Sequence, residues 1–345
     1  MNFSPIQFKD EKLILLDQRK LPNEEVFIEY NSIEEVHRGI KDMVVRGAPC
    51  IGFTAIFGMA IWIKHHSDFT LEQLSKAGNY LNSARPTAVN LRFEIDNVIE
   101  MIKSEELTGA EAFDRVVKFG FHKIEQSEIE NRKMAEFAEE DLAKICGKSK
   151  FNILTHCNTG FLACGSVGTA LGVVQNLHEK GKLENCWVDE TRPYLQGSRL
   201  TAYELTKLNA PHKVVVEGAA SFLMRNGMVD AIFTGADRIV ANGDTANKVG
   251  TSNLSIIAAH YGIPFYIVAP SSSFDLETKT GADIEIELRP QDEILSYKEY
   301  RIAPKLTEAY NPSFDITDGK LITGIISEKG IAKGNYVETL PGIVK

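Results

Sequence analysis

The residues best suited to chemistry lie in the second half of the chain, where short apolar runs end in polar turns. Cys157 follows the run FNILTH (151–156), and Asp237 follows the run DAIFTG (230–235). An ionised thiol can act as a nucleophile or base, and a carboxyl group can donate or accept a proton. If both runs are strands of one parallel sheet, their carboxyl ends border the same ligand crevice. The spacing therefore predicts a thiol and a carboxyl group at one site.

Cys157 also precedes a helix predicted to start near residue 160, whose N-terminus would favour a thiolate. The competing interpretation is a buried structural cysteine. His156 is adjacent, but neighbouring residues of a strand point to opposite faces, which argues against a Cys–His pair and predicts a structural role for His156. For Asp237 the competing interpretation is a helix cap.

A phosphate-binding segment is predicted at NGDTANKVGT (242–251). It has a glycine turn, small polar residues and Asn247-Lys248 at a predicted helix start, where backbone N–H groups and one lysine charge could cradle an anion. It is not a Walker loop, because GxxxxGK[ST] is absent. Arg46 and Arg85 lie at predicted helix ends beside Gly or Pro, where they could clamp phosphate or simply be solvated.

A dinucleotide-binding fingerprint is not present. The glycines after the first of these strands stand at positions 160, 165, 168 and 172, a spacing that differs from GxGxxG. This argues against a nicotinamide-dependent oxidoreductase.

The elements that must position these residues form two patterns. From residue 150 onward, short apolar runs alternate with helical segments that begin near residues 160, 198, 219 and 247, which predicts an α/β fold with a parallel sheet and crossover helices. The predicted strands are residues 151–156, 186–190, 213–216, 230–235 and 264–270. The segment from about residue 283 mixes short strands and turns and is not placed.

The N-terminal part is predicted to be mainly helical. The runs LILL and VFIEY within residues 12–30 predict a β hairpin. Helical spacing of apolar residues then predicts further elements: a helix from Ser32 to Val45, a buried core helix over 48–63, a helix over 88–103, and one long or two joined helices over 110–145. We expect a mainly helical domain (1–120), a helical linker (121–148) and a catalytic domain (149–345).

Composition excludes several classes of protein. Apolar residues make up 43% and charged residues 25% of the 345 residues, and the net charge is −9, so we expect a folded protein that is not attracted to nucleic acid or anionic membranes. The five cysteines include no CxxC pair, which predicts reduced thiols and no zinc finger. The first residues lack the pattern of a signal peptide. We expect a soluble cytoplasmic protein.

Five segments carry a resemblance to a known family: RGAPCIG (46–52), SARPTAVNL (83–91), THCNTG (155–160), DETRPYLQGSRLTAYEL (189–205) and GADRIVANGDTANKVGT (235–251). Together they closely resemble the methylthioribose-1-phosphate isomerases. This family is related to the regulatory subunits of the exchange factor for eukaryotic translation initiation, which share its fold without its chemistry.

The resemblance implies an aldose–ketose isomerase of methionine salvage that converts 5-methylthioribose 1-phosphate to 5-methylthioribulose 1-phosphate without a metal or other cofactor. It implies a small, mainly helical N-terminal domain on a Rossmann-like C-terminal domain, as a homodimer. It assigns catalysis to Cys157 and Asp237. It assigns substrate binding to Arg46, Gly47, Ala48, Arg85, Gln196, Asn247 and Lys248.

The chain departs from the family pattern just after Cys157. Phe161 stands where a smaller residue is expected, and Ser166-Val167 where glycine-rich sequence is expected. These differences leave 5-deoxyribose 1-phosphate and ribose 1,5-bisphosphate as alternative substrates. A non-catalytic regulatory subunit is the alternative of another class.

Overall fold

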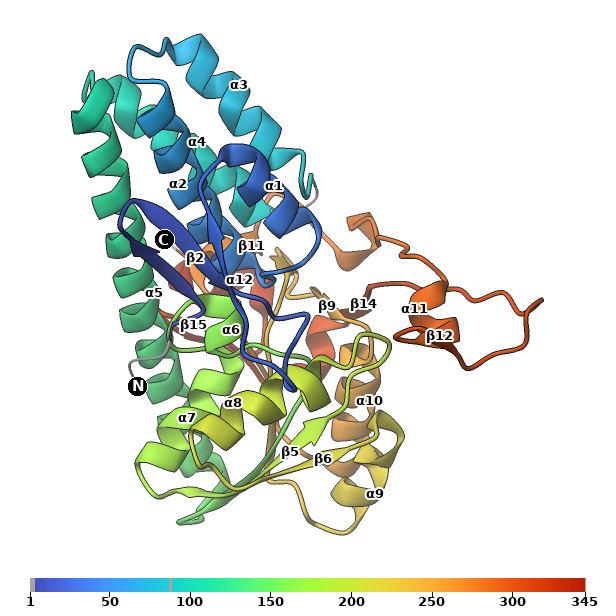
Figure 1. Ribbon diagram of the computed structural model, residues 1–345. Coiled ribbons are helices and arrows are strands. Elements are labelled where there is room, and N and C mark those ends of the chain that lie inside the picture. Colours follow the sequence, from blue (N-terminus) through green and yellow to red (C-terminus); the bar gives the residue numbers. More distant parts are fainter. Residues whose placement is uncertain (1–3, 87–88, 345) are drawn as a thin grey trace. The chain divides into compact units, whose positions relative to one another are not determined.

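The computed structural model describes residues 4–86 and 89–344. These residues form two compact units, which can be followed along the chain by colour in Figure 1. The first unit contains the described residues up to Ile129 together with Gly160–Gly168, and the second contains Glu130–Thr159 together with the described residues from Thr169 onward. The domain boundaries near residues 120 and 148 remain a prediction about the folding domains.

The first unit opens with an antiparallel sheet, β1 (Ile6–Lys9), β2 (Lys12–Leu16) and β3 (Phe27–Tyr30), in the order β1-β2-β3. The pairing of β2 with β3 confirms the predicted hairpin. β1 was not predicted, because its two-residue turn consists of Asp10 and Glu11, with φ of 49° and 58°. Such a turn is normally signalled by glycine or asparagine.

Six helices among the described residues contribute to this unit: α1 (Ile33–Lys41), α2 (Ala48–His65), α3 (Leu71–Asn82), α4 (Val89–Ser104), the N-terminal part of α5 (Gly109–Cys146) and α6 (Phe161–Cys164). Ser32 caps α1 as predicted, accepting a hydrogen bond from the Glu35 N–H. The helix ends at Lys41 and not at Val45, because Met43 has a φ of 57°, which no α-helix accommodates. α3 was missed, although Thr70 and Gln73 form a capping box at its start.

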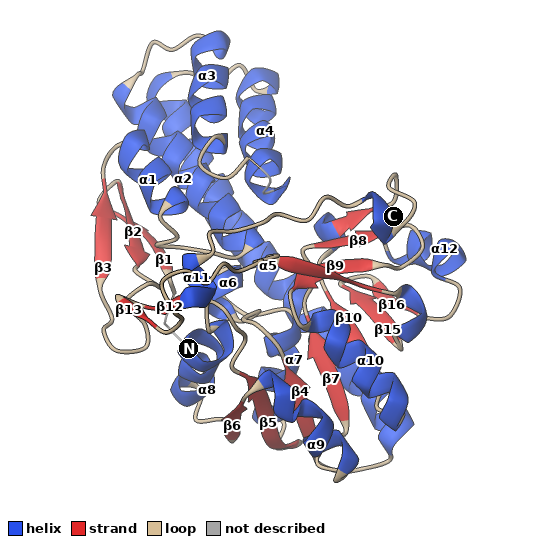
Figure 2. Ribbon diagram, turned by 90° about the vertical axis from the view of Figure 1, so that its right-hand side faces the viewer, coloured by secondary structure: helices blue, strands red, loops and turns tan. Residues whose placement is uncertain are grey.

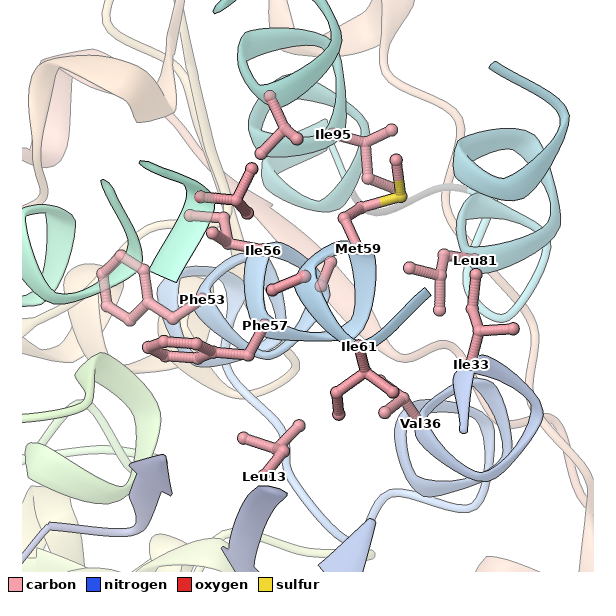
Figure 3. Packing of buried hydrophobic residues seen from close by; sticks show 14 of the residues in the cluster. Leu13, Ile33, Val36, Phe53, Ile56, Phe57, Met59, Ile61, Leu81 and Ile95 are labelled. Carbon is pink, nitrogen blue, oxygen red and sulfur yellow. The ribbon is translucent and has the colours of Figure 1, made fainter. Parts of the chain in front are cut away.

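Helix α2 forms the centre of the first unit. It is long and apolar enough to cross a membrane, but 78% of it is buried inside the protein. Figure 3 shows Phe57, Met59 and Ile61 of α2 packed among side chains from β2, α1, α3 and α4. Burial of each large apolar side chain contributes about 1.5–3 kcal/mol to folding. The predicted core helix over residues 48–63 is therefore confirmed.

The second unit contains a seven-stranded sheet: β4 (Phe151–Thr155), β5 (Leu183–Asp189), β6 (His212–Val215), β7 (Ala231–Thr234), β10 (Phe265–Val268), β15 (Gly324–Ser327) and β16 (Gly330–Ala332). The order is β16-β15-β10-β7-β4-β5-β6, and every pair is parallel except β15 with β16. The predicted parallel sheet is confirmed in an α/β fold. Because β4 to β6 extend in one direction and β7 to β15 in the other, the strand order reverses between β4 and β7, which makes this the topological switch point.

Helices cover both faces of this sheet (Figure 2). The C-terminal part of α5, α7 (Ala170–Glu179) and α8 (Ala202–Lys207) pack on one face, and α9 (Ala220–Arg225), α10 (Thr251–Tyr261) and α12 (Tyr336–Thr339) on the other. Adjacent strand residues alternate between the two layers, since Ile153 belongs to one buried cluster and Leu154 to the other.

A second sheet continues from the carboxyl end of β7. Its strands are β8 (Arg238–Val240), β9 (Thr245–Lys248), β11 (Phe274–Asp275) and β14 (Phe314–Thr317), in the order β11-β8-β9-β14. The other short elements are α11 (Asp292–Leu295), β12 (Ser296–Tyr297), β13 (Tyr300–Arg301), a π-helix (Gly197–Thr201) and 3-10 helices at Glu217–Ala219, Ser271–Ser273, Gly281–Asp283, Gly319–Leu321 and Leu340–Ile343.

Candidate active site

Cys157 lies in a strained turn at the carboxyl end of β4. Its φ of 63° is in the left-handed region, which few residues other than glycine adopt. Two threonines hold this backbone: the Cys157 N–H donates to Thr191 Oγ1 at 2.9 Å, and the Cys157 carbonyl accepts from Thr201 Oγ1 at 2.6 Å. The residue is 7% exposed. Strained backbone persists only where the surroundings fix it, and it is common at functional sites.

The helix predicted to follow Cys157 is present but is only one turn long. α6 has four residues, and the next helix, α7, begins at Ala170. A macrodipole requires several aligned peptide units, so one turn supplies little of the predicted stabilisation of a thiolate. The helix start near residue 160 is thus confirmed, and the thiolate at Cys157 stays a prediction.

The segment after β5 folds back on the end of that strand. Thr191 and Leu195 both have left-handed φ, 63° and 60°, and for the β-branched Thr191 this is an outlier. A Cβ built on Gly197 would lie 1.6 Å from the Asp189 carbonyl oxygen. Only glycine fits at this position, which lets the loop place Gln196 at the carboxyl edge of the sheet.

Gln196 directly precedes the π-helix, an element often found at functional sites. It is 6% exposed, and within the described residues its Oε1 accepts no hydrogen bond. A buried carbonyl oxygen without a donor is unfavourable by roughly 1–3 kcal/mol. A ligand hydroxyl would satisfy it, in keeping with the predicted role in substrate binding.

Asp237 lies beyond β7, on the other side of the switch point from Cys157. The residue after it begins strand β8, so the helix-cap interpretation is wrong. Its backbone N–H donates to the Ala246 carbonyl at 2.9 Å, and the residue is exposed to solvent. The two strand ends approach closely, since a Cβ on Gly235 would lie 2.7 Å from Thr159 Cγ2. The chain thus brings the Cys157 and Asp237 turns to the same edge of the sheet.

Asn247 and Lys248 lie on strand β9, so the predicted helix start at these residues is wrong. β9 pairs with β14, which places Asp315 opposite Asn247. α10 begins only at Thr251, and the N–H groups of Gly250 and Ser252 donate to Asp315 at 2.7 and 3.1 Å. These two groups therefore bind an internal carboxylate and are not open to a phosphate.

The side chains of Asn247 and Lys248 are held by hydrogen bonds to neighbouring residues. Asn247 Nδ2 donates to Thr251 Oγ1 at 3.0 Å. Lys248 Nζ donates to the Ser313 carbonyl at 2.9 Å and lies 4.5 Å from the centre of the Phe314 ring. Because β9 pairs with β8 beside Asp237, the lysine charge belongs to the same end of the second unit.

His156 does not pair with Cys157. Its Nδ1 lies 3.1 Å from Asp189 Oδ2 and its Nε2 lies 2.9 Å from the Val249 carbonyl oxygen. The prediction that adjacent strand residues diverge is confirmed at this position.

The remaining predicted residues, Arg46, Gly47, Ala48 and Arg85, belong to the first unit. The first three lie at the start of α2. Gly47 has a φ of 91°, and a Cβ on it would lie 2.6 Å from Ala163, so the glycine of RGAP is required for packing against α6. Arg85 follows α3 and is half-buried, while residues 87 and 88 of the SARPTAVNL segment lie outside the described residues.

A family model described as the initiation factor 2 subunit family matches residues 44–334. The chain belongs to this family. Among its curated relatives, methylthioribose-1-phosphate isomerase 2 of Pseudothermotoga lettingae is 42% identical over 341 residues, which cover 98% of this chain and 97% of that protein. A Petrotoga mobilis protein named 5-deoxyribose 1-phosphate isomerase is 40% identical over 353 residues, 99% of each chain.

A solved structure of the family agrees with this. The crystal structure of 5-methylthioribose 1-phosphate isomerase from Pyrococcus horikoshii OT3 matches with a TM-score of 0.90 and 39% identity, over 99% of this chain and 95% of that one. The resemblance to the methylthioribose-1-phosphate isomerases, first indicated by five sequence segments, is confirmed.

Buried polar partners around Cys157 were not predicted. Asn158 Nδ2 donates to Glu204 Oε1 at 2.8 Å, and both residues are buried. The available signal was Glu204 itself, an acid within the apolar stretch of LTAYEL, since buried acids are rare unless they are paired. The threonines at 191 and 201 carried no signal in the sequence.

Proposed function

We propose that this protein is an aldose–ketose isomerase that converts 5-methylthioribose 1-phosphate to 5-methylthioribulose 1-phosphate in methionine salvage. The observation that carries the proposal is the placement of Cys157 after β4 and Asp237 after β7, one on each side of the switch point. Relatives that match almost the whole chain carry the name of this activity. The enzyme is an intramolecular oxidoreductase, since it moves hydrogen from C2 to C1 of one sugar.

The chemistry follows from the phosphate on the anomeric carbon. This phosphate prevents the ring from opening as a free hemiacetal does, so a group must protonate the ring oxygen. We assign this step to Asp237, which acts as a general acid once the bound sugar shields it from water. Hydrogen then passes from C2 to C1 by one of two routes. In the enediol route Cys157 is the base that removes the C2 proton; in the other route a hydride moves directly from C2 to C1 and no base takes it up. In deuterated water, solvent label at C1 of the product supports the base, and complete retention of a C2 label supports the shift.

The substrate contacts that we propose are those of the family resemblance, Arg46, Gly47, Ala48, Arg85, Gln196, Asn247 and Lys248. Two contacts have local support. The Gln196 Oε1 is a buried acceptor suited to a sugar hydroxyl, and Lys248 offers a positive charge to the phosphate.

The 5-substituent is the part of the substrate that needs a direct test. Phe161 and Val167 are buried where the family pattern has smaller residues, and the relative from Petrotoga mobilis carries the name of a 5-deoxyribose 1-phosphate isomerase. We therefore propose assays of the purified protein with the 5-methylthio, 5-deoxy and 5-phospho sugars. The highest kcat/KM with the 5-methylthio sugar supports the proposal. Activity with none of the three favours a non-catalytic regulatory subunit.

We also propose that the protein works in the cytoplasm as a homodimer, as the family resemblance implies. None of the five cysteines, all of which lie in the described part of the chain, forms a disulfide, which suits a reducing compartment.

A further inference from the structure

One imidazole ring connects three segments of the second unit. His156 directly follows β4 and precedes Cys157, Asp189 is the last residue of β5, and Val249 directly follows Lys248. His156 Nδ1 lies 3.1 Å from Asp189 Oδ2, and its Nε2 lies 2.9 Å from the Val249 carbonyl oxygen. Both side chains are fully buried. The ring therefore links the Cys157 turn to the turn that carries Lys248.

The two contacts fix the number of protons on the pair. The Val249 carbonyl can only accept, so the hydrogen on Nε2 is required. Nδ1 and Asp189 Oδ2 can then approach only if one further proton lies between them, since two lone pairs would otherwise face each other in a buried site. The pair holds this proton whether it resides on the ring or on the carboxyl group.

The surrounding charges favour keeping the shared proton. Burial alone would lower the pKa of His156, but the hydrogen bond and charge of Asp189 outweigh burial and raise it. Glu217 on the segment after β6 and Asp315 on β14 also act on the imidazole, and Lys248 acts on Asp315. Among the described residues, the acids facing the ring thus outnumber this nearby cation, which favours the protonated pair.

The turn at Val249 and Gly250 packs closely against the His156 ring. The Val249 N–H donates to the Ser313 carbonyl at 3.1 Å. A Cβ on Gly250 would lie 2.8 Å from His156 Cε1, so the ring fills the space beneath the turn. A change in the position of the ring therefore moves the turn, and with it the lysine that precedes it.

We propose that the buried His156–Asp189 pair, with its shared proton, is a positioning device that sets the place of the Lys248–Gly250 turn relative to the Cys157 turn. His156 touches neither the thiol nor, on this proposal, the substrate. The expected changes in KM and kcat rest on the proposed isomerase function. The device acts through the phosphate-binding lysine, so its loss should weaken substrate binding more than the chemical step.

Three variants separate positioning from general structural damage. In Asp189→Asn, the amide N–H can donate to a neutral His156, which preserves both contacts without a shared proton. In His156→Gln, the side-chain amide can still donate to the Val249 carbonyl. In His156→Leu, both contacts are lost. His212→Leu is the matched control, because the hydrogen bonds of the His212 ring among the described residues go to the Ala210 carbonyl and the Thr206 side chain, both close to it in sequence.

The kinetic arm measures KM and kcat against pH for the pentose 1-phosphate. We expect His156→Leu to raise KM about tenfold or more with kcat changed about threefold or less, and His156→Gln to recover most of this loss. We expect wild-type KM to rise at alkaline pH, where the pair loses its shared proton, and Asp189→Asn to remove that rise. An unchanged KM in His156→Leu, or an alkaline rise retained in Asp189→Asn, would overturn the inference.

The second arm requires no substrate. Amide hydrogen exchange of residues 246–254, compared as protection factors at matched pH, should fall about tenfold or more in His156→Leu and stay near wild type in Asp189→Asn and His212→Leu. If His156→Leu fails to fold, the inference is tested by the KM of His156→Gln and by the alkaline KM of Asp189→Asn. A fully protected segment in His156→Leu would contradict the positioning role. If the wild type has no isomerase activity but His156→Leu shows the expected loss of protection, the proposed function is refuted and the inference stands.

Discussion

At the scale of single residues, the backbone of Cys157 is held by partners far away in the sequence. Thr191 accepts from its N–H, and Thr201 donates to its carbonyl. Both threonines reach Cys157 from the segment after β5, so the position of the thiol depends on the fold of that loop. At Asp237, the backbone N–H donates to the Ala246 carbonyl of the neighbouring strand β9.

The first prediction is that Cys157→Ser and Asp237→Asn each reduce turnover at least about a thousandfold, because each removes a proposed proton-transfer group. Both residues lie in turns beyond strand ends, so the fold should survive. Steady-state kinetics and circular dichroism test this together. Activity within about tenfold of wild type would remove that residue from the mechanism.

A second prediction concerns phosphate. Lys248→Ala and Arg85→Ala should each raise KM about tenfold or more with a smaller effect on kcat, because charge-assisted contacts to the phosphate are lost in the ground state and transition state alike. Inorganic phosphate should also compete more weakly with the substrate. If KM is unchanged in both variants, the phosphate binds elsewhere.

The sequence could predict the two proposed catalytic residues because their strands are continuous apolar runs, whose ends are visible in the printed sequence. It could not predict that Asp315 occupies the N–H groups of Gly250 and Ser252. That contact depends on the pairing of β14 with β9 across more than sixty residues. The local sequence around either strand does not indicate which distant strand it pairs with.

At the scale of elements, the loop from Thr191 to Gly197 depends on one glycine. Gly197→Ala should lower the free energy of unfolding by roughly 2–4 kcal/mol and abolish activity, because the added methyl group would overlap the Asp189 carbonyl. Gly218→Ala is the control, since nothing lies within 4 Å of a Cβ at that position. Urea unfolding of both variants gives the comparison. Equal stabilities would mean that the loop relaxes without difficulty.

The contact between His156, which follows β4, and Asp189, which ends β5, predicts how the free energy of unfolding depends on pH. The pKa of His156 is raised in the folded protein, so above the unfolded value of about 6.5 the folded state holds one proton more than the unfolded state. The stability contributed by this proton is full below about pH 6.5 and is lost as pH rises through the folded pKa, with a slope of at most about 1.4 kcal/mol per pH unit. Asp189→Asn should flatten this slope in urea unfolding between pH 6 and 9. A slope equal to wild type would contradict it.

Strand prediction succeeded where the strand reads as a continuous apolar run and failed where it does not, whatever its burial. β4, β7 and β10 are buried on both faces and read as apolar runs. β9 reads TANK, a polar sequence that is a strand only because β8 and β14 pair on either side of it. β15 is as buried as β10, but its sequence, GIIS, has two isoleucines between a glycine and a serine and does not read as an apolar run.

At the scale of the whole molecule, the proposed homodimer is open to a direct measurement. Light scattering at micromolar concentration should give twice the chain mass of 38.3 kDa, because family resemblance implies a dimer. A mass equal to one chain would contradict the proposal, and enzyme activity of that monomer would show that the site is complete without a partner.

The α/β class and the parallel sheet could be predicted from the alternation of apolar runs and helical segments. The composition of the first unit could not, because Gly160–Gly168 belongs to it although it follows β4 in the chain. Its packing depends on particular contacts, such as the Gln18 side chain donating to the Leu162 carbonyl at 2.8 Å. No periodicity in residues 160–168 indicates this.

The inclusion of Gly160–Gly168 in the first unit has a consequence for synthesis of the protein on the ribosome. Residues up to Ile129 are made first, but the surface that Gly47 packs against is Ala163. The N-terminal unit therefore cannot complete its packing until β4 of the other unit has already been translated. The order of translation and the order of folding are interleaved in this chain, and a gene fragment that ends at residue 129 would encode a helical unit that lacks part of its own interior.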